Sequence, residues 1–485
     1  LESIDIPDSV RTIGSSAFHN CSGLESIDIP DSVRTIGSSA FHNCSGLESV
    51  EIPYSVTTIG TYAFYGCSNL SGVYIADLAA WCKIDFNGSY NNLSSNPLYY
   101  AHNLYLNGEL ITQLEIPKGV TSIANFAFAG CSVLTSIKIP DSVTNIGYAA
   151  FYNCSNLSGV YIADLAAWCR IDFTTWNSNP LYYAHNLYLN DELIQQLVIP
   201  EGVISIGDFA FAGCSGITDI TIPDSVRTIG TYAFNGCSGL QSVSIQSGIT
   251  SIGDCAFYGC SGLTSIIIPN SVKSIGSGAF GECTSLEGIT IPFVGGSITT
   301  ASDTYQYPFG YIFGTSIYTG GVETRQYYYG SSTGRTTNSD YYIPLSLKNV
   351  TVTGGNVLYG AFYNCSGLTN IVIPNSITSI EGRAFSCCSG ITDITIPDSV
   401  RTIGTYAFSG CNNLRGIVIS DNINSIGNYA FDDCSALTIY CEAESKLSGW
   451  SSSWNSSNCP VVWAYRGDVA QYIDFSDKEK IAVQV

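Results

Sequence analysis

Residues 24–46 read L-E-S-I-D-I-P-D-S-V-R-T-I-G-S-S-A-F-H-N-C-S-G, and residues 1–23 are an identical copy. The Ala-Phe-x-x-Cys signature near the end of this stretch returns thirteen times along the 485-residue chain, at a step of 23 residues wherever the copies run uninterrupted. A fixed period of this size is typical of a solenoid, because one such coil is too small to bury its own apolar face. The signature therefore predicts the architecture of nearly the whole chain.

Within one repeat, the apolar positions predict two extended segments and one short turn. Ile27 and Ile29 alternate with polar neighbours, which is the period of a half-buried strand. Pro30 ends this strand because proline cannot donate the next ladder hydrogen bond. A second extended segment follows at 33–36, and the apolar residues of 40–44 are expected on one face of a short helical turn. Stacked coils then form a parallel sheet.

The phenylalanine and cysteine of each signature recur at a fixed place in every coil, so we interpret them as a buried packing ladder. Metal binding is the alternative for these cysteines, but no His or second Cys accompanies each copy, and we expect neither a metal site nor a cofactor. The reference pairs of the ladder are Phe41 and Cys44, Phe64 and Cys67, Phe234 and Cys237, and Phe408 and Cys411. Off the ladder, Cys441 and Cys459 are the only candidate disulfide.

The composition limits the classes of partner. The formal net charge is −21, which disfavours nucleic acids and anionic membranes as partners. No apolar stretch approaches the roughly 18 residues that a membrane helix needs, so we expect no membrane insertion. The chain contains no methionine and starts at the first position of a repeat, so we expect it to be a piece of a longer protein whose signal or anchor lies elsewhere.

The consensus L-x-x-I-x-I-P-x-x-V-x-x-I-G-x-x-A-F-x-x-C resembles the BspA-like leucine-rich repeat family of surface proteins from bacteria and some protists. The resemblance covers nearly the whole chain, with the thirteen repeats in residues 1–441. It implies an α/β right-handed solenoid with a parallel sheet on the concave face, and short helical turns and irregular segments elsewhere. Family members with an assigned role look like adhesins or host-protein binders. The resemblance therefore implies an extracellular or cell-surface protein with a protein or glycan partner.

Two of the three insertions that interrupt the repeat are copies of one another, at about 73–113 and 160–196. Each begins with Val-Tyr-Ile-Ala-Asp-Leu-Ala-Ala-Trp-Cys, in which Asp77 is the expected N-cap of a short helix in the first copy. Asn107-Gly108 predicts a hairpin with a tight turn. We interpret these duplicated insertions as structural elements, with a dedicated site as the alternative.

The third insertion, at about 293–355, is rich in Gly, Ser, Thr and Tyr. Long loops on a rigid scaffold often carry binding sites, and tyrosine suits protein or carbohydrate contact. The alternative is a hairpin lobe whose tyrosines pack on the flank of the solenoid. The tyrosines concerned are Tyr305, Tyr307, Tyr311, Tyr327, Tyr328, Tyr329, Tyr341 and Tyr342.

The remaining predictions concern the C-terminal segments and an acidic stripe on the first coils. Residues 442–465 abandon the repeat and contain three tryptophans, so we expect them to cap the last coil, and residues 466–485 form a tail or the start of a further region. Outward positions of the first three strands carry Asp5, Asp28 and Glu51. This stripe could bind a basic partner or Ca²⁺, and a solvated surface is the simpler interpretation.

No sequence motif indicates catalysis. The four histidines lie in duplicated segments, and the chain has no phosphate-binding loop, nucleophile elbow or His-Glu-x-x-His motif. His102 and His185 are best interpreted as copied packing or surface residues. We therefore expect a non-catalytic, adhesin-like binding solenoid. A structural spacer or coat component is the alternative, and a hydrolase with a site between an insertion and the solenoid is the least favoured.

Overall fold

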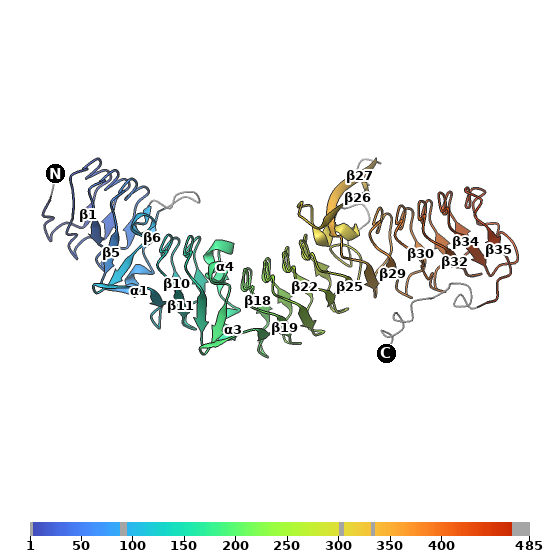
Figure 1. The fold of residues 1–485 in the computed structure, drawn as a ribbon, viewed down its shortest axis with the longest axis horizontal. Helices are drawn as coiled ribbons and strands as arrows, with labels where there is room; N and C mark the ends of the chain where they lie inside the picture. The colour runs from blue at the N-terminus through green and yellow to red at the C-terminus, as the bar shows by residue number, and fades with distance from the viewer. Residues whose placement is uncertain (1–2, 88–94, 300–304, 331–334, 468–485) are drawn as a thin grey trace. The chain divides into compact units, whose positions relative to one another are not determined.

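The structure is a computed structural model that describes residues 3–87, 95–299, 305–330 and 335–467. The chain divides into two compact units, Leu1–Leu240 and Gln241–Val485, and each is a stack of solenoid coils (Figure 1). Most strands are two to four residues long, because each coil crosses a given side of the stack only once. Helix is confined to four-residue segments of the first two insertions and short 3₁₀ segments among the described residues.

In the first unit, short strands on one side of the coils pair in parallel. Thr12 faces Thr35, which in turn faces Thr58, so that each coil repeats the register of the one before. These columns consist of β1 (Thr12–Ile13), β2 (Thr35–Ile36), β4 (Thr58–Ile59) and β6 (Asp85–Phe86), then β10 (Ser122–Ile123), β12 (Asn145–Ile146) and β14 (Asp172–Phe173), then β18 (Ser205–Ile206) and β20 (Thr228–Ile229).

Longer strands form the parallel sheets on another side of the same coils. The first sheet consists of β3 (Ser49–Glu51), β5 (Gly72–Ile75), β7 (Leu104–Leu106) and β8 (Glu109–Leu110). The second consists of β9 (Gln113–Glu115), β11 (Ser136–Ile139), β13 (Gly159–Ile162), β15 (Leu187–Leu189) and β16 (Glu192–Leu193), and β17 (Gln196–Val198) and β19 (Asp219–Ile222) belong to a third. The alternation predicted from the sequence is present, since Ile27 and Ile29 are buried and Asp28 between them is exposed.

The Ala-Phe-x-x-Cys stretch forms hydrogen-bonded turns, so the predicted helical turn is wrong for these coils. The Cys44 N–H donates to the Phe41 carbonyl three residues back, at 3.1 Å. Ser39 has a φ of 55°, in the left-handed region, which breaks any helical course. The Phe41 N–H instead donates to the Ala63 carbonyl of the next coil at 2.8 Å. Backbone groups that a helix pairs internally are paired here between coils.

The phenylalanine rings of successive coils stack inside each unit. In the first unit, the Phe41 ring lies 5.3 Å from Phe18 and 5.2 Å from Phe64. The cysteines lie beside them, and the Cys67 thiol donates to the Phe41 carbonyl at 3.2 Å. All eight reference residues of the ladder have 0% exposure, namely Phe41, Cys44, Phe64, Cys67, Phe234, Cys237, Phe408 and Cys411.

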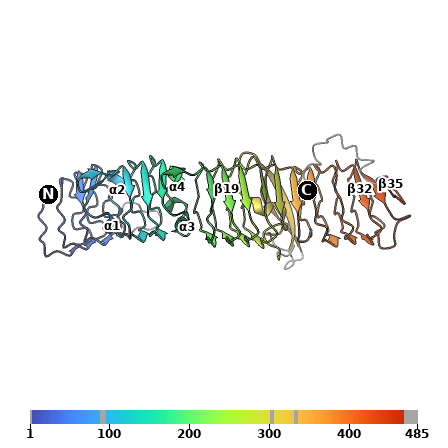
Figure 2. The same ribbon diagram turned by 90° about the horizontal axis from the view of Figure 1, so that it is seen from below.

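The first two insertions add helices and a hairpin to the coils. They contain α1 (Leu78–Trp81), α2 (Leu98–Ala101), α3 (Leu165–Trp168), η2 (Trp176–Ser178) and α4 (Leu181–Ala184). Asp77 is confirmed as an N-cap, since its carboxylate accepts from two amides of α1. The hairpin is also confirmed, because β7 and β8 pair antiparallel around Asn107 and Gly108, both with positive φ. Figure 2 shows α2 and α4 on a different side of the coils from α1 and α3.

The second unit repeats the two columns of strands. Its longer strands are β21 (Ser242–Ile245), β23 (Ser265–Ile267), β25 (Gly288–Ile291), β28 (Asn349–Val352), β29 (Asn370–Val372), β32 (Gly416–Ile419), β34 (Thr438–Cys441) and β35 (Val461–Val462). Its shorter strands are β22 (Ser251–Ile252), β24 (Ser274–Ile275), β30 (Ser379–Ile380), β31 (Thr402–Ile403) and β33 (Ser425–Ile426). None of the helices in the described ranges has the length and apolarity needed to cross a membrane.

The third insertion leaves the stack after β25 and returns at β28, and these two strands pair directly in parallel. Between them lie η3 (Phe309–Phe313) and a hairpin of β26 (Gly321–Gly330) and β27 (Arg335–Pro344). The η3 segment occupies the place of a turn in the ladder, because Phe280 donates to the Ile312 carbonyl and Phe309 donates to the Ala361 carbonyl, each at 2.9 Å. Among the described residues of this insertion, the hairpin is therefore the element added outside the stack.

Residues after β34 contact the last coil through tryptophans. The Trp454 ring lies edge-on to Phe431, the last phenylalanine of the ladder, with centroids 5.9 Å apart. Trp450 lies 5.0 Å from Trp454, and its indole N–H donates to the Ile423 carbonyl at 2.9 Å. Strand β35 pairs with β34. Phe431 consequently has no solvent exposure.

Candidate binding surfaces

Polar side chains of the first insertion satisfy carbonyl groups of the coil that follows it. Trp81 Nε1 and Asn96 Nδ2 donate to the Ala127 carbonyl at 2.9 and 3.2 Å. His102 Nδ1 lies 2.9 Å from the Gly130 carbonyl. In uninterrupted coils, a backbone N–H group of the preceding coil donates to the carbonyl at the position of Ala127. The side chains of Trp81 and Asn96 therefore replace the backbone N–H donor that the insertion has displaced.

The second insertion repeats this arrangement through Trp168, Asn179 and His185. Trp168 Nε1 and Asn179 Nδ2 donate to the Ala210 carbonyl at 2.9 and 3.0 Å, and His185 Nδ1 lies 2.9 Å from the Gly213 carbonyl. Both histidines are exposed, so of the predicted packing or surface roles the structure gives them the surface one, with a hydrogen bond to a backbone carbonyl. The hydrogen bond also fixes the tautomer: a carbonyl accepts only, so Nδ1 carries the proton and Nε2 of the neutral ring is an acceptor.

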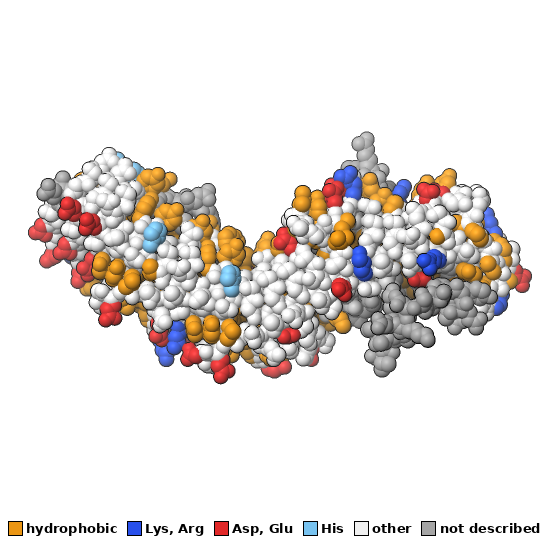
Figure 3. Space-filling model, in the orientation of Figure 1, with side chains coloured by type: hydrophobic (Ala, Val, Ile, Leu, Met, Phe, Trp, Pro, Cys, Tyr) orange, Lys and Arg blue, Asp and Glu red, His pale blue; other side chains and the backbone are white. Residues whose placement is uncertain are grey.

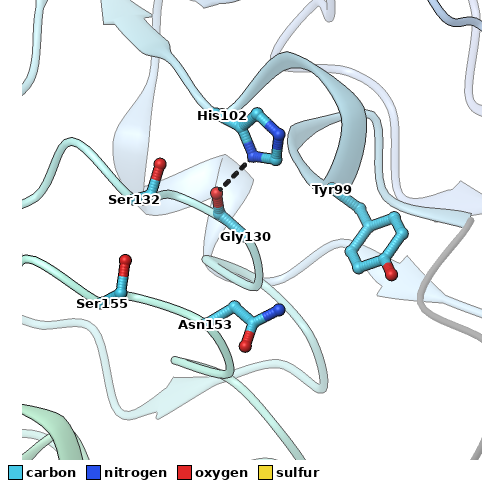
Figure 4. Close-up of a pocket in the computed structure, with 6 residues that line it drawn as sticks. All are labelled: Tyr99, His102, Gly130, Ser132, Asn153 and Ser155. Atoms are coloured by element: carbon cyan, nitrogen blue, oxygen red, sulfur yellow. Dashed lines mark hydrogen bonds between the residues drawn. The ribbon is translucent and has the colours of Figure 1, made fainter.

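A groove of about 420 Å³ opens beside α2 in the first unit. Figure 4 shows the Tyr99 ring and the His102 imidazole on the α2 side, with Asn153 on a turn of the solenoid opposite them. The floor consists of two successive ladder turns, whose Ser132 and Ser155 hydroxyls point the same way. The lining residues are Tyr99, His102, Gly130, Ser132, Asn153 and Ser155, and none is an acid, lysine or arginine.

Two stacked tyrosine pairs lie on the outward face of the longer-strand sheets. Tyr74 of β5 stacks on Tyr105 of β7 with centroids 4.5 Å apart, and Tyr161 stacks on Tyr188 at 4.4 Å. Glycine precedes each pair by two positions; at Gly72 a β-carbon would lie 3.0 Å from the Tyr74 ring. The glycines therefore leave room for the rings to lie against the sheet.

The acidic stripe lies on the exposed side of the first coils, where only Glu51 belongs to a strand, β3. Asp5, Asp28 and Glu51 are all exposed, and Glu51 is in register with Tyr74 on the next strand. Farther along the first unit, the equivalent positions of two neighbouring strands are occupied by Glu115 and Lys138. These two side chains form an ion pair at 3.7 Å. No group of three or more His, Cys, Asp or Glu residues suited to a metal ion occurs in the part of the chain that the structure describes. The carboxylates thus present a solvated negative surface.

The structure separates the tyrosines of the third insertion into two groups. Tyr307, Tyr311 and Tyr341 are 3%, 8% and 1% exposed, and burial raises the pKa of each phenol. These three pack inside the lobe, so their predicted role in ligand contact is wrong. Tyr305 is 53% exposed. Tyr327, Tyr328 and Tyr342 are partly exposed, and the side chain of Tyr329 lies outside the described residues.

A buried glutamine fixes the hairpin to the solenoid. Gln326 has 0% exposure, accepts from the Gly310 N–H at 2.6 Å and donates to the Tyr363 carbonyl at 3.0 Å. On the opposite face of the strand, Arg325 forms two hydrogen bonds with Asp340, at 2.7 and 2.9 Å. These bonds lower the pKa of the Asp340 carboxyl. One face of the hairpin is thus attached to the solenoid, and the opposite face is in contact with solvent.

Cys441 and Cys459 do not form the predicted disulfide. Both are free thiols, as are the other seventeen cysteines. Cys441 is a buried residue of β34, and burial raises its pKa to about 12. The Cys459 thiol instead donates to the Cys434 carbonyl at 3.5 Å. Cys441 and Cys459 therefore pack in separate places and do not face one another as a disulfide pair.

The groove residues were not anticipated from the sequence. Asn153 occupies the position before the ladder cysteine, where most other coils carry glycine or asparagine, and its φ of 59° explains why the position favours these two residues. The sequence feature that relates to the groove is the spacing of the duplicated insertions. Two uninterrupted coils, those of Phe128 and Phe151, lie between them. Helices α2 and α4 therefore stand on either side of these two coils.

Stacked parallel strands, a buried phenylalanine ladder and turns of fixed length define a leucine-rich repeat solenoid. Residues 1–95, 100–169, 184–305 and 341–455 match the family described as the BspA type leucine-rich repeat region. The chain belongs to this family. A comparison with curated proteins finds no match.

Solved structures of leucine-rich repeat proteins are similar to the chain. A leucine-rich repeat protein from Bacteroides ovatus is 24% identical over 94% of this chain and 87% of its own, with a TM-score of 0.42. A leucine-rich cell surface protein from Faecalibacterium prausnitzii is 24% identical over 92% of each chain, with a TM-score of 0.24. The pneumococcal vaccine antigen PcpA is 15% identical over 96% of this chain and 80% of its own, with a TM-score of 0.33.

Proposed function

We propose that this protein is a non-catalytic binding solenoid, secreted or held at a cell surface, that engages a protein or glycan partner in the manner of an adhesin. Membership of the BspA type family supports this class of role. The acidic composition disfavours nucleic acid as the partner.

The observation that carries the proposal is the open face of the longer-strand sheets. Parallel sheets are normally covered on both faces, whereas here the outward positions are exposed. The stacked pair of Tyr74 and Tyr105 in the first unit is partly exposed, and Ile267 and Val372 in the second unit are 67% and 46% exposed. Figure 3 shows hydrophobic side chains gathered in patches among mostly uncharged surface. Exposed apolar patches of this kind mark interaction sites.

A structural spacer is the second candidate. The identity of residues 1–23 and 24–46 favours it, because a spacer needs length and no particular surface. A hydrolase is not proposed, since the hydrogen bonds of His102 and His185 hold them as parts of the coil contacts.

The test is a binding screen of the full chain against extracellular-matrix proteins and glycans. We expect at least one partner, with binding reduced by Tyr74→Ala and Tyr105→Ala and unchanged by Tyr54→Ala, an exposed tyrosine outside the sheets. Circular dichroism of each variant controls for folding. Absence of any partner in the screen would refute the binding role and favour the spacer.

A further inference from the structure

The groove beside α2 has one wall from the first insertion and a floor from two successive ladder turns. Tyr99 belongs to α2, and His102 directly follows it. The turn of Asn153 is held from its other side, because the Tyr183 hydroxyl of α4 contacts the backbone of Asn153. The two floor turns are one coil apart, about 4.8 Å, so a flat six-membered ring can span them.

The groove combines an aromatic ring with uncharged donors and acceptors. Tyr99 offers a ring face and a hydroxyl, and the Asn153 amide offers both a donor and an acceptor. His102 presents Nε2 as an acceptor, because its Nδ1 proton is held by the Gly130 carbonyl. The Ser132 and Ser155 hydroxyls can donate and accept. A charged ligand would lack a counter-charge among these residues, whereas a neutral polyhydroxylated ligand can pair with all of them.

The second insertion lacks one of these features. Gly236 stands where the first groove has Asn153, so the amide is absent. In the second copy Trp176 packs on Tyr182, the counterpart of Tyr99, with centroids 4.5 Å apart. The backbone bond of the histidine is the same in both copies. The histidine bond therefore serves the fold, whereas the Asn153 amide is particular to the first groove.

From this geometry we infer that the groove lined by Tyr99, His102 and Asn153 is a binding subsite for a neutral saccharide. A pyranose ring stacks on Tyr99, and its hydroxyls bond to the Asn153 amide, to His102 Nε2 and to a serine hydroxyl. This inference rests on the proposed binding function and narrows the partner at this site to a glycan.

The test is titration of the full chain with neutral disaccharides, cellobiose, lactose and N,N′-diacetylchitobiose, followed by saturation-transfer NMR and calorimetry. We expect binding of at least one of them. Asn153→Gly reproduces the residue of the second copy at a φ that glycine adopts freely, so the fold is retained. It removes about one hydrogen bond and is expected to weaken binding about fivefold to tenfold. Tyr99→Ala is expected to abolish binding, and the matched control Tyr182→Ala is expected to leave it unchanged.

Two results would overturn the inference. If none of the disaccharides binds at millimolar concentration, the groove is not a saccharide site, although partners found in the matrix-protein screen would leave the wider binding function standing. If a disaccharide binds equally to wild type, Asn153→Gly and Tyr99→Ala, then glycan binding is real but lies elsewhere. Loss of both the disaccharides and all partners of the screen would refute the proposed function itself.

Discussion

Replacing Asn96 by alanine tests whether the insertion is held by side chains that substitute for backbone donors. Asn96 has 0% exposure and donates to the Phe126 and Ala127 carbonyls, while its own side-chain oxygen accepts from the Leu98 N–H at 2.9 Å. Ala127 keeps its bond from Trp81, and the Phe126 carbonyl keeps its bond from the Ala129 N–H. The variant therefore removes the partner of one buried group, the Leu98 N–H. Leaving one such group without that bond costs about 1–3 kcal/mol.

Native-state hydrogen exchange is the appropriate assay, because solenoids open locally and are seldom two-state. The amides of Phe126 and Phe128 donate to the next coil and report on this turn. We expect them to exchange about tenfold to a hundredfold faster in Asn96→Ala. Asn179→Ala should produce the same loss in the second copy, and exposed Asn156→Ala should have no effect. Exchange in Asn96→Ala within twofold of wild type would refute the reasoning.

Three further predictions concern the ladder, the first coils and the thiols. Phe408→Ala removes a fully buried ring stacked at 5.3 and 5.6 Å between its neighbours, and guanidinium unfolding should show a loss of about 3–5 kcal/mol. Burial, and secondarily the charge of His19, lower the pKa of His42 below 6.5, so the folded state resists protonation. Stability is therefore present above about pH 6.5 and declines as the pH falls below it; hydrogen exchange of the first coils should show this decline, and His42→Gln should remove it. Alkylation of the unfolded, unreduced chain should modify both Cys441 and Cys459, whereas two unmodified cysteines would indicate a disulfide after all.

The repeated part of the fold was predictable because each repeated side chain meets the same neighbour in every coil. Ile27 and Ile29 show this, since their alternation with polar residues was sufficient to predict which side chains are buried, although residues 27–29 form no strand in this coil. The turn around Phe41 was mispredicted, because its backbone N–H pairs with Ala63 in another coil and not within a local helix. Spacing within one repeat does not distinguish these two hydrogen-bond patterns.

The candidate sites were less predictable because the insertions do not recur in every coil. Their sequences therefore contain no periodic pattern that shows which side chains face the solvent. Tyr305 and Tyr307 are two residues apart in one Tyr-rich segment, yet one is half exposed and the other is buried by contacts distant in sequence. The groove combines α2 of the first insertion with the turns of two later coils, one of which carries Asn153. Its residues belong to three separate segments, so no local motif marks it.

The identical first two coils also have a consequence for how such a protein changes over generations. The hydrogen bond from Phe18 to Ala40 has the same length, 2.8 Å, as that from Phe41 to Ala63, so each coil offers its successor the same junction. Gain or loss of one 69-nucleotide unit by recombination would therefore leave every junction intact. Each such event would move the groove and the tyrosine pairs by about 4.8 Å along the stack relative to the first coil. The length of the solenoid would then vary while the proposed binding surfaces keep their residues.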